Sequence, residues 1–166
     1  MSISEDGLRK NQANFASLSP LSFLERTRKT FPNQTAIEYK DYKLSYKQAG
    51  QRCDALANLI KNQNFNSGTT IAVMLPNIPV MWECHFGVPM ATGVLNAINT
   101  RLDSHTVQFI LEHGEAKLFI YDSEYSPIVE KVFENLKNPP TLIEFVDEIA
   151  GNKRSNFANK VNCLDY

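Results

Sequence analysis

The most apolar stretch of the chain, residues 69–103, constrains the fold more than any other segment. Residues 71–75 form a short continuous apolar run closed by Pro76 and Asn77, which is typical of a strand buried on both faces of a parallel sheet. A stretch of helix length follows, and a second short apolar run covers residues 94–98. Strand, helix and strand within about 30 residues make a βαβ unit. We expect the rest of the chain to pack around it.

The helix between these two strands is expected to begin at Asn77 or Ile78. Capping is the role we favour for Asn77, although its place after a strand is also where open α/β sheets bind ligands. The helix is apolar nearly all round and should be buried on more than one side. Pro89 should kink it, because proline has no N–H to donate. The apolar residues of this helix are Val80, Met81, Trp82, Phe86, Val88 and Met90.

Two smaller elements precede this unit. Ser19 and Pro20 predict a helix start, with serine as the cap and proline in the first turn. That helix should end near Phe31, which precedes a proline. Residues 36–44 alternate like two short strands with a turn at 40–41, which predicts a hairpin.

Ser45 and Gln48 form a capping-box pattern in front of an amphipathic segment. The apolar spacing predicts a helix of about 17 residues. It should end in the asparagine-rich loop at residues 62–68. Cys53 lies on the apolar face, so we assign it to the core rather than to chemistry.

The downstream segment continues the alternation of helix and strand. Ser104 is expected to cap a helix that ends at Gly114, with the glycine as the residue just past the helix. Residues 117–121 read as a strand, Ser126 opens the next helix, and residues 141–146 read as a last strand.

The predicted fold class is therefore α/β. Residues 69–147 give the order β-α-β-α-β-α-β, and short connections make this a mostly parallel sheet with helices on both faces. A helix and a small hairpin precede the sheet. Residues 148–166 are polar and show no clear periodicity, so no element is assigned to them.

Composition excludes several classes of protein. The net charge of -1 argues against a general binder of nucleic acid or of anionic membranes. No apolar run approaches the ~18 residues of a membrane span, and the polar N-terminus predicts no secretory signal. Cys53, Cys84 and Cys163 are odd in number and lack CxxC spacing, which favours reduced thiols over a disulfide or a zinc site. We expect a cytoplasmic protein.

Two features of the sequence could in principle bind phosphate. Residues 67–70 read SGTT, but they lead into a strand rather than a helix and no lysine follows within the next ten residues, so we favour a plain turn. Arg101 could reach a phosphate, yet we favour an ion pair with Asp103 or with another acid. The chain contains no GxGxxG, GxxxxGK[ST], GxSxG or HExxH motif.

The histidines do not predict a metal site. His85 is adjacent to Cys84, and neighbouring helical positions do not share a face. His105 and His113 lie at opposite ends of one short predicted helix. We expect all three histidines to be surface or structural residues.

Several ungapped blocks carry a family resemblance. They read SPLSFLER at 19–26, VMLPNIP at 73–79, HFGVPMA at 85–91, NTRLD at 99–103 and FILEHGEAK at 109–117. Together they closely resemble the N-terminal part of AMP-forming acyl-CoA synthetases, which belong to the adenylate-forming superfamily. The subtype is similar to the fatty-acyl ligases and their short-acid relatives.

The resemblance implies a reaction but assigns it no residue here. In this family a carboxylic or fatty acid attacks the α-phosphate of Mg-ATP, giving an acyl-adenylate and pyrophosphate, and CoA then displaces AMP. The family's phosphate loop reads roughly T-S-G-T-T-G-x-P-K-G, and residues 67–70 lack its continuation. The resemblance therefore identifies no catalytic, cofactor-binding or metal-binding residue. ATP, Mg²⁺ and CoA belong to the family, and none is assigned to this segment.

The implied organisation has a flexible N-terminus at 1–18, a partial AMP-binding domain at 19–147, and a tail at 148–166 where the family domain would continue. We expect a truncated or split N-terminal segment that is inactive alone. The alternative is a non-catalytic assembly module that pairs with a complementary chain, the missing remainder of the ligase, or with itself as a dimer. A free-standing nucleotide-binding domain is a third interpretation. No nucleic acid and no membrane span are expected.

Overall fold

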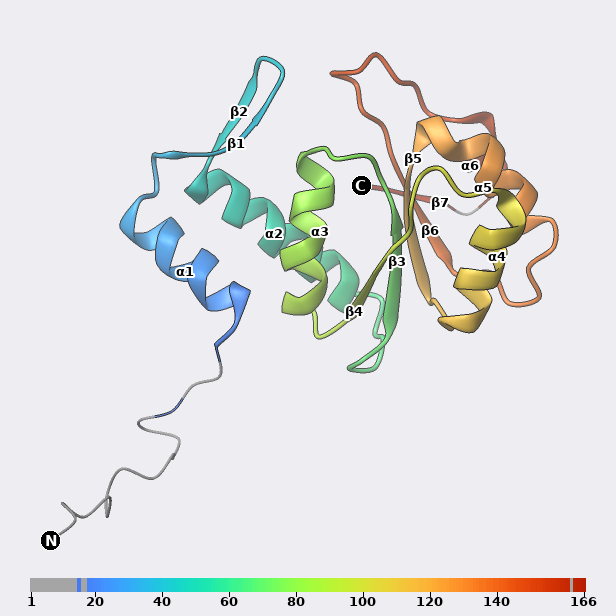
Figure 1. Ribbon diagram of the computed structural model, residues 1–166, viewed down its shortest axis with the longest axis horizontal. Helices are drawn as coiled ribbons and strands as arrows, with labels where there is room; N and C mark the ends of the chain where they lie inside the picture. The colour runs from blue at the N-terminus through green and yellow to red at the C-terminus, as the bar shows by residue number, and fades with distance from the viewer. Residues whose placement is uncertain (1–14, 16–17, 162) are drawn as a thin grey trace, which may run out of the picture.

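The computed structural model describes residue 15, residues 18–161 and residues 163–166, so most of the predicted flexible N-terminus lies outside the described residues. Its elements are α1 (Pro20–Thr30), β1 (Thr35–Tyr39), β2 (Tyr42–Ser45), α2 (Tyr46–Lys61), β3 (Thr70–Met74), α3 (Pro79–Met90), β4 (Val94–Ala97), α4 (Ser104–His113), β5 (Leu118–Asp122), the 3₁₀ turn η1 (Ser123–Tyr125), α5 (Ser126–Phe133), β6 (Thr141–Phe145), α6 (Asn156–Lys160) and β7 (Cys163–Asp165). Figure 1 shows a central sheet with α2 and α3 on one side and α4, α5 and α6 on the other.

The central sheet has the order β4-β3-β5-β6-β7 and is parallel throughout. Ile71 of β3 pairs with Leu118 of β5, and Leu118 pairs with Thr141 of β6. Every residue of β5 is buried, as expected for an inner strand covered on both faces. The predicted parallel α/β fold with a preceding helix and hairpin is confirmed.

Alternate residues of the inner strands enter two separate cores. The core beneath α2 and α3 takes Ile71, Val73, Leu118, Ile120 and Ile143. The core beneath α4, α5 and α6 takes Ala72, Met74, Phe119, Tyr121 and Leu142. Successive side chains of a strand point to opposite faces of the sheet, so neighbouring residues enter different cores. None of the helices in the described part of the chain is long and apolar enough to cross a membrane.

Helices α1 and α2 and the β1–β2 hairpin form at the positions that the capping residues and the turn predict. Ser19 caps α1 by accepting from the Leu21 N–H at 3.3 Å. Ser45 and Gln48 complete the predicted capping box at the start of α2, with distances of 3.3 and 2.9 Å. The hairpin β1–β2 turns at Lys40, which has a φ of 52°.

Helix α3 begins one or two residues later than expected, and Asn77 does not cap it. Ile78 is the N-cap and makes no side-chain hydrogen bond, because its side chain is a hydrocarbon. Pro79 occupies the first turn, where its fixed φ suits the helix. Pro89 is the next-to-last residue of the helix. A Cβ atom built on Gly87 would lie 2.9 Å from Leu56, so α2 and α3 pack closely at this glycine.

Both ends of α4 differ from the prediction. Asp103, not Ser104, is the N-cap, and its carboxylate accepts from the Thr106 N–H at 3.0 Å. Gly114 is the C-cap with an ordinary φ of -78°. The left-handed residue is Glu115, with a φ of 49°. An aspartate one residue upstream caps a helix as well as a serine does, so composition alone left the choice open.

The C-terminal segment contains two elements that the sequence did not predict. Helix α6 has five residues and β7 has three, and β7 forms the fifth strand of the sheet beside β6. Elements this short do not complete enough periods to give a pattern. β7 forms by pairing with the free edge of β6, which is a tertiary contact and not a local pattern.

Candidate functional site

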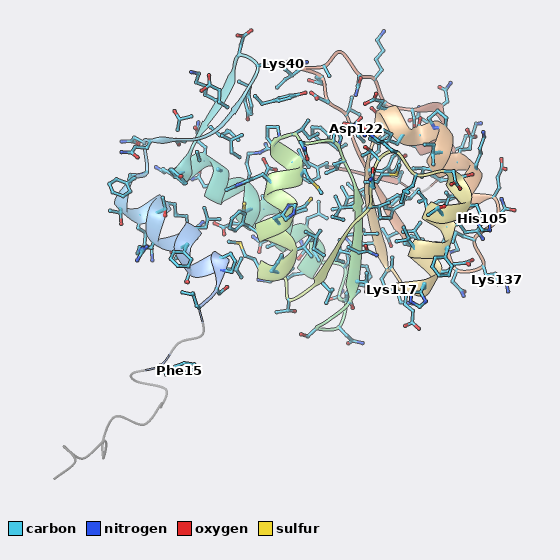
Figure 2. All side chains as sticks on the ribbon, in the orientation of Figure 1. Phe15, Lys40, His105, Lys117, Asp122 and Lys137 are labelled. Atoms are coloured by element: carbon cyan, nitrogen blue, oxygen red, sulfur yellow. The ribbon has the colours of Figure 1, made fainter. Side chains whose placement is uncertain are left out.

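The order of the strands defines one edge of the sheet as the candidate ligand site. From β3 the chain goes to β4 on one side and then crosses to β5 on the other. The carboxyl ends of β3 and β5 therefore form the topological switch point, where open α/β sheets bind ligands. Figure 2 shows Lys117 and Asp122 at opposite ends of β5, with Asp122 on the side of Lys40 in the hairpin.

Asp122 is the central polar residue of this edge and is fully buried. Its Oδ1 accepts from the Glu124 N–H at 2.9 Å and from Asn152 Nδ2 at 3.0 Å. Within the described part of the chain, its Oδ2 and the hydroxyl of buried Ser123 have no hydrogen-bond partner. Burial raises the pKa of Asp122, and the nearby charge of Asp147 acts in the same direction.

A second carboxyl group links the hairpin to this edge. Asp147, in the loop after β6, accepts from the Tyr39 hydroxyl at 2.7 Å and from the Ala150 N–H at 3.0 Å. The hydrogen bond to Asp147 raises the pKa of Tyr39 to about 12, so the phenol stays protonated. Lys40 donates to the carbonyl of Ile149 at 3.1 Å. The hairpin is thus tied to the 147–152 loop beside the switch point.

Asp122→Asn is expected to flatten the pH dependence of stability. The folded-state pKa of Asp122 lies above its ordinary value of 3.8, so its ionisation opposes folding and the contribution of Asp122 to stability falls as the pH rises through this window. Asparagine keeps an acceptor for the Glu124 N–H and removes the charge. Urea unfolding between pH 3 and pH 7 measures the slope.

Asp103→Asn is the matched control for that experiment. The Thr106 N–H and hydroxyl hold the pKa of the exposed Asp103 below its ordinary value, so its ionisation favours folding above that value and the contribution is lost as the pH falls. Its replacement should therefore remove a slope of the opposite sign. A wild-type slope that is unchanged in Asp122→Asn would contradict the role of Asp122.

The SGTT segment lies at the other edge of the sheet. Gly68 and Thr69 form a turn at the amino end of β3, where the Thr69 N–H and hydroxyl both donate to the carbonyl of Asn66, at 3.1 and 2.7 Å. The predicted turn before a strand is present. The segment does not lie at the switch point.

The histidines and cysteines are not brought together into one site. His85 is exposed, and its Nδ1 lies 2.8 Å from the carbonyl of Met81 on its own helix. His113 stacks on Phe109 within α4. Cys53 and Cys84 are fully buried, and burial raises the pKa of both thiols, to about 12 for Cys53. The assignment of Cys53 to the core is confirmed.

The expected ion pair of Arg101 is not formed with any residue that the structure describes. Asp103 uses its carboxylate to cap α4, and Arg101 is exposed, with its backbone N–H donating to Asn99 Oδ1 at 3.0 Å. Asn77, which we expected to cap α3, is exposed at the carboxyl end of β3. Both predictions were wrong: the Asp103 carboxylate accepts from the Thr106 N–H and hydroxyl, and Ile78 rather than Asn77 is the N-cap of α3.

Sequence reasoning missed two buried carboxylates on either side of the sheet. Glu83 of α3 is fully buried and binds the Arg52 guanidinium and the Tyr166 hydroxyl, the latter at 2.6 Å. Glu144 of β6 accepts from the Tyr121 hydroxyl and the Ser155 N–H, each at 2.9 Å, and from the Ser155 hydroxyl. The signal was a single acid inside an apolar run, which requires a partner when buried.

The switch-point edge does not fit the triphosphate that the resemblance implies. Phosphate groups are bound by backbone N–H groups at glycine-rich turns and by basic side chains. The acids of this edge are Asp122 and Asp147, both buried, with Glu124 beside them, and the nearby Lys40 already donates to a carbonyl. The described residues also contain no group of three His, Cys, Asp or Glu side chains placed to hold a metal ion.

The family model and the similar proteins point to the same family. Residues 24–162 match the family model described as AMP-binding enzyme. An acetate–CoA ligase of Humulus lupulus is 34% identical over 168 residues, a match that covers 97% of this chain and 30% of that enzyme. A peroxisomal trans-cinnamate:CoA ligase of Petunia hybrida is 42% identical over 131 residues, covering 79% of this chain and 23% of that enzyme.

Solved structures share the fold. An anthranilate CoA ligase in complex with anthranoyl-AMP superposes with a TM-score of 0.74 at 19% identity, covering 82% of this chain and 26% of that one. A fatty acyl CoA synthetase of Mycobacterium tuberculosis superposes with a TM-score of 0.65 at 23% identity. That match covers 72% of this chain and 24% of the synthetase. The chain therefore spans about a quarter to a third of the length of the proteins that it matches.

Proposed function

The chain belongs to the AMP-binding enzyme family, and from that premise we propose that it forms the N-terminal scaffold of an ATP-dependent ligase that joins a carboxylic acid to CoA. The observation that carries this proposal is the match over 97% of the chain to 30% of an acetate–CoA ligase. In the proposed reaction, the acid attacks the α-phosphate of ATP, pyrophosphate leaves, and the CoA thiol then displaces AMP from the acyl-adenylate.

Residues 1–166 alone are proposed to lack this activity. The sequence has no glycine-rich phosphate loop, and the buried acids at the carboxyl ends of β5 and β6 would repel a triphosphate. What this segment supplies is a parallel sheet on which other parts of such an enzyme would be placed. For the acid we propose the broad carboxylic class, with fatty acids as the narrower proposal, because the relatives' names include acetate, butyrate and trans-cinnamate.

ATP–pyrophosphate exchange tests the proposal directly. Purified residues 1–166 are incubated with Mg-ATP, labelled pyrophosphate and a panel of acids from acetate to a long-chain fatty acid, with an acetate–CoA ligase as the active control. We expect exchange in the control and none above background for this chain. Acid-dependent exchange by the chain alone would overturn the proposal.

We also propose a cytoplasmic location, and the peroxisome is the alternative because five relatives carry the word peroxisomal in their names. A fluorescent fusion imaged against a peroxisomal marker separates the two: colocalisation with the marker would contradict the proposal.

A further inference from the structure

A cavity of about 520 Å³ lies between α2 and the carboxyl end of β6. Leu56 and Leu59 of α2, together with Phe145 and Tyr166, form much of its apolar wall. The rings of Phe145 and Tyr166 meet edge to face, with centroids 5.6 Å apart. A cavity of this volume with a largely apolar wall and a few charged groups is the usual setting for a small-molecule ligand.

Arg52 presents an oriented guanidinium to this cavity. Its Nε donates to Glu83, which is fully buried and also accepts from the Tyr166 hydroxyl at 2.6 Å. Among the described residues, Glu83 is the one hydrogen-bond partner of this guanidinium, so the edge formed by the two terminal nitrogens is available. That edge can bind a carboxylate through two parallel hydrogen bonds, and the ion pair with Glu83 already fixes its direction.

Glu148 supplies an opposite charge close to Arg52. Its side chain is exposed and lines the cavity. A second cavity, of about 250 Å³, shares Arg52, Phe145, Val146 and Glu148 with the first. Arg52 and Glu148 therefore both lie where the two cavities meet.

The charges of the wall select the class of ligand. The cavity is lined by one basic residue, Arg52, and by three acids, Glu83, Glu144 and Glu148. Glu83 and Glu144 are buried and hydrogen-bonded, which leaves Arg52 and Glu148 as the charged groups that a ligand can reach. A simple carboxylate would be repelled by Glu148, and a simple amine would be repelled by Arg52. A ligand that carries both charges is attracted by both residues.

We infer that this cavity binds a free α-amino acid with a large apolar side chain. The terminal nitrogens of Arg52 bind the α-carboxylate, Glu148 binds the α-ammonium group, and the apolar wall takes the side chain. Burial of that side chain supplies the hydrophobic part of the affinity. The inference does not rest on the proposed ligase reaction, because neither Asp122 nor Asp147 lines this cavity and binding requires no ATP.

A titration with three matched compounds tests the inference. Purified residues 1–166 are titrated by saturation-transfer NMR with L-phenylalanine, with 3-phenylpropanoate, which lacks the ammonium group, and with 2-phenylethylamine, which lacks the carboxylate. We expect L-phenylalanine to bind about ten-fold more tightly than either analogue, because each analogue loses one charged contact.

Two variants test the charged contacts. Arg52→Lys keeps a positive charge beside Glu83 but loses the planar fork, so its affinity for L-phenylalanine should fall about ten-fold. Glu148→Gln should also weaken binding of L-phenylalanine, yet it should bind 3-phenylpropanoate more tightly than the wild type does, because the repulsion is gone. Glu148 is exposed, so its variant is expected to fold normally.

Ala55→Trp tests the location of the site without changing a charge. Ala55 is exposed and lines the cavity, so the indole would occupy the space of the ligand and abolish binding. Asn58→Trp is the matched control, because Asn58 is exposed on the same helix but lines a different surface hollow, and its variant should bind like the wild type. Melting temperatures of all variants confirm that they are folded.

Each outcome decides the inference. It would be overturned by absence of L-phenylalanine binding, by equal or tighter binding of either analogue to the wild type, or by unchanged binding in folded Ala55→Trp. The exchange assay is separate: acid-dependent exchange by residues 1–166 contradicts the proposed function and leaves the amino-acid site unaffected.

Discussion

Arg52→Leu is expected to lower the free energy of unfolding by about 3 kcal/mol, because it leaves the carboxylate of Glu83 buried without its ion-pair partner. Glu83 is fully buried, and only the Tyr166 hydroxyl, at 2.6 Å, would remain bound to it. The Arg52 side chain itself is 39% exposed, which places the cost at the lower end of the range for buried pairs. Urea unfolding followed by circular dichroism gives the value.

Two variants make this measurement specific. Lys43→Leu breaks the exposed pair between Lys43 and Glu38, whose side chains are 59% and 60% exposed, and should cost less than about 1 kcal/mol. Adding Glu83→Gln to Arg52→Leu removes the unpaired charge and should restore at least half of the lost stability. Equal effects of Arg52→Leu and Lys43→Leu would show that the Glu83 pair is not a buried ion pair in solution.

Glu144→Leu is expected to cost about 3 kcal/mol, since it leaves one buried donor and two part-buried donors without their acceptor. Tyr121 is fully buried, and its hydroxyl loses the carboxylate that it now reaches at 2.9 Å. The Ser155 N–H and hydroxyl lose the same partner, and Ser155 is the N-cap of α6. Chemical denaturation gives the global value, and amide hydrogen exchange in residues 156–160 reports on α6.

Glu144→Gln is the matched variant, because its amide oxygen can still accept one of these hydrogen bonds. It should cost clearly less than Glu144→Leu and should protect α6 amides better. If both variants are as stable as the wild type, Glu144 does not anchor α6 and β7 to the sheet.

Local patterns predicted most elements because their causes are local. The Ser45 and Gln48 capping box lies within one turn, and the strand at 71–75 is a continuous apolar run. The prediction was off by one residue at the N-caps of α3 and α4, which are Ile78 and Asp103, and at the C-cap of α4, which is Gly114. It was silent on α6 and β7, which are too short for a pattern.

The candidate site was only partly predictable. The carboxyl ends of parallel strands were named as the ligand edge through Asn77, but Asp122 and Asp147 were not singled out. Asp122 is the last residue of β5 and follows four apolar residues, and that position was the available signal. Its unpartnered Oδ2 could not be read from the sequence, because satisfaction of a buried atom depends on packing.

The sequence by itself determined the fold class, the family resemblance and the doubly apolar character of α3, since these follow from periodicity and from ungapped blocks. Only the tertiary structure decided which acids are buried and what holds them. Glu83 meets Arg52 from 31 residues away and Tyr166 from 83, and Tyr121 meets Glu144 from 23. Such pairs form where helices and strands cross, and no local pattern encodes that distance.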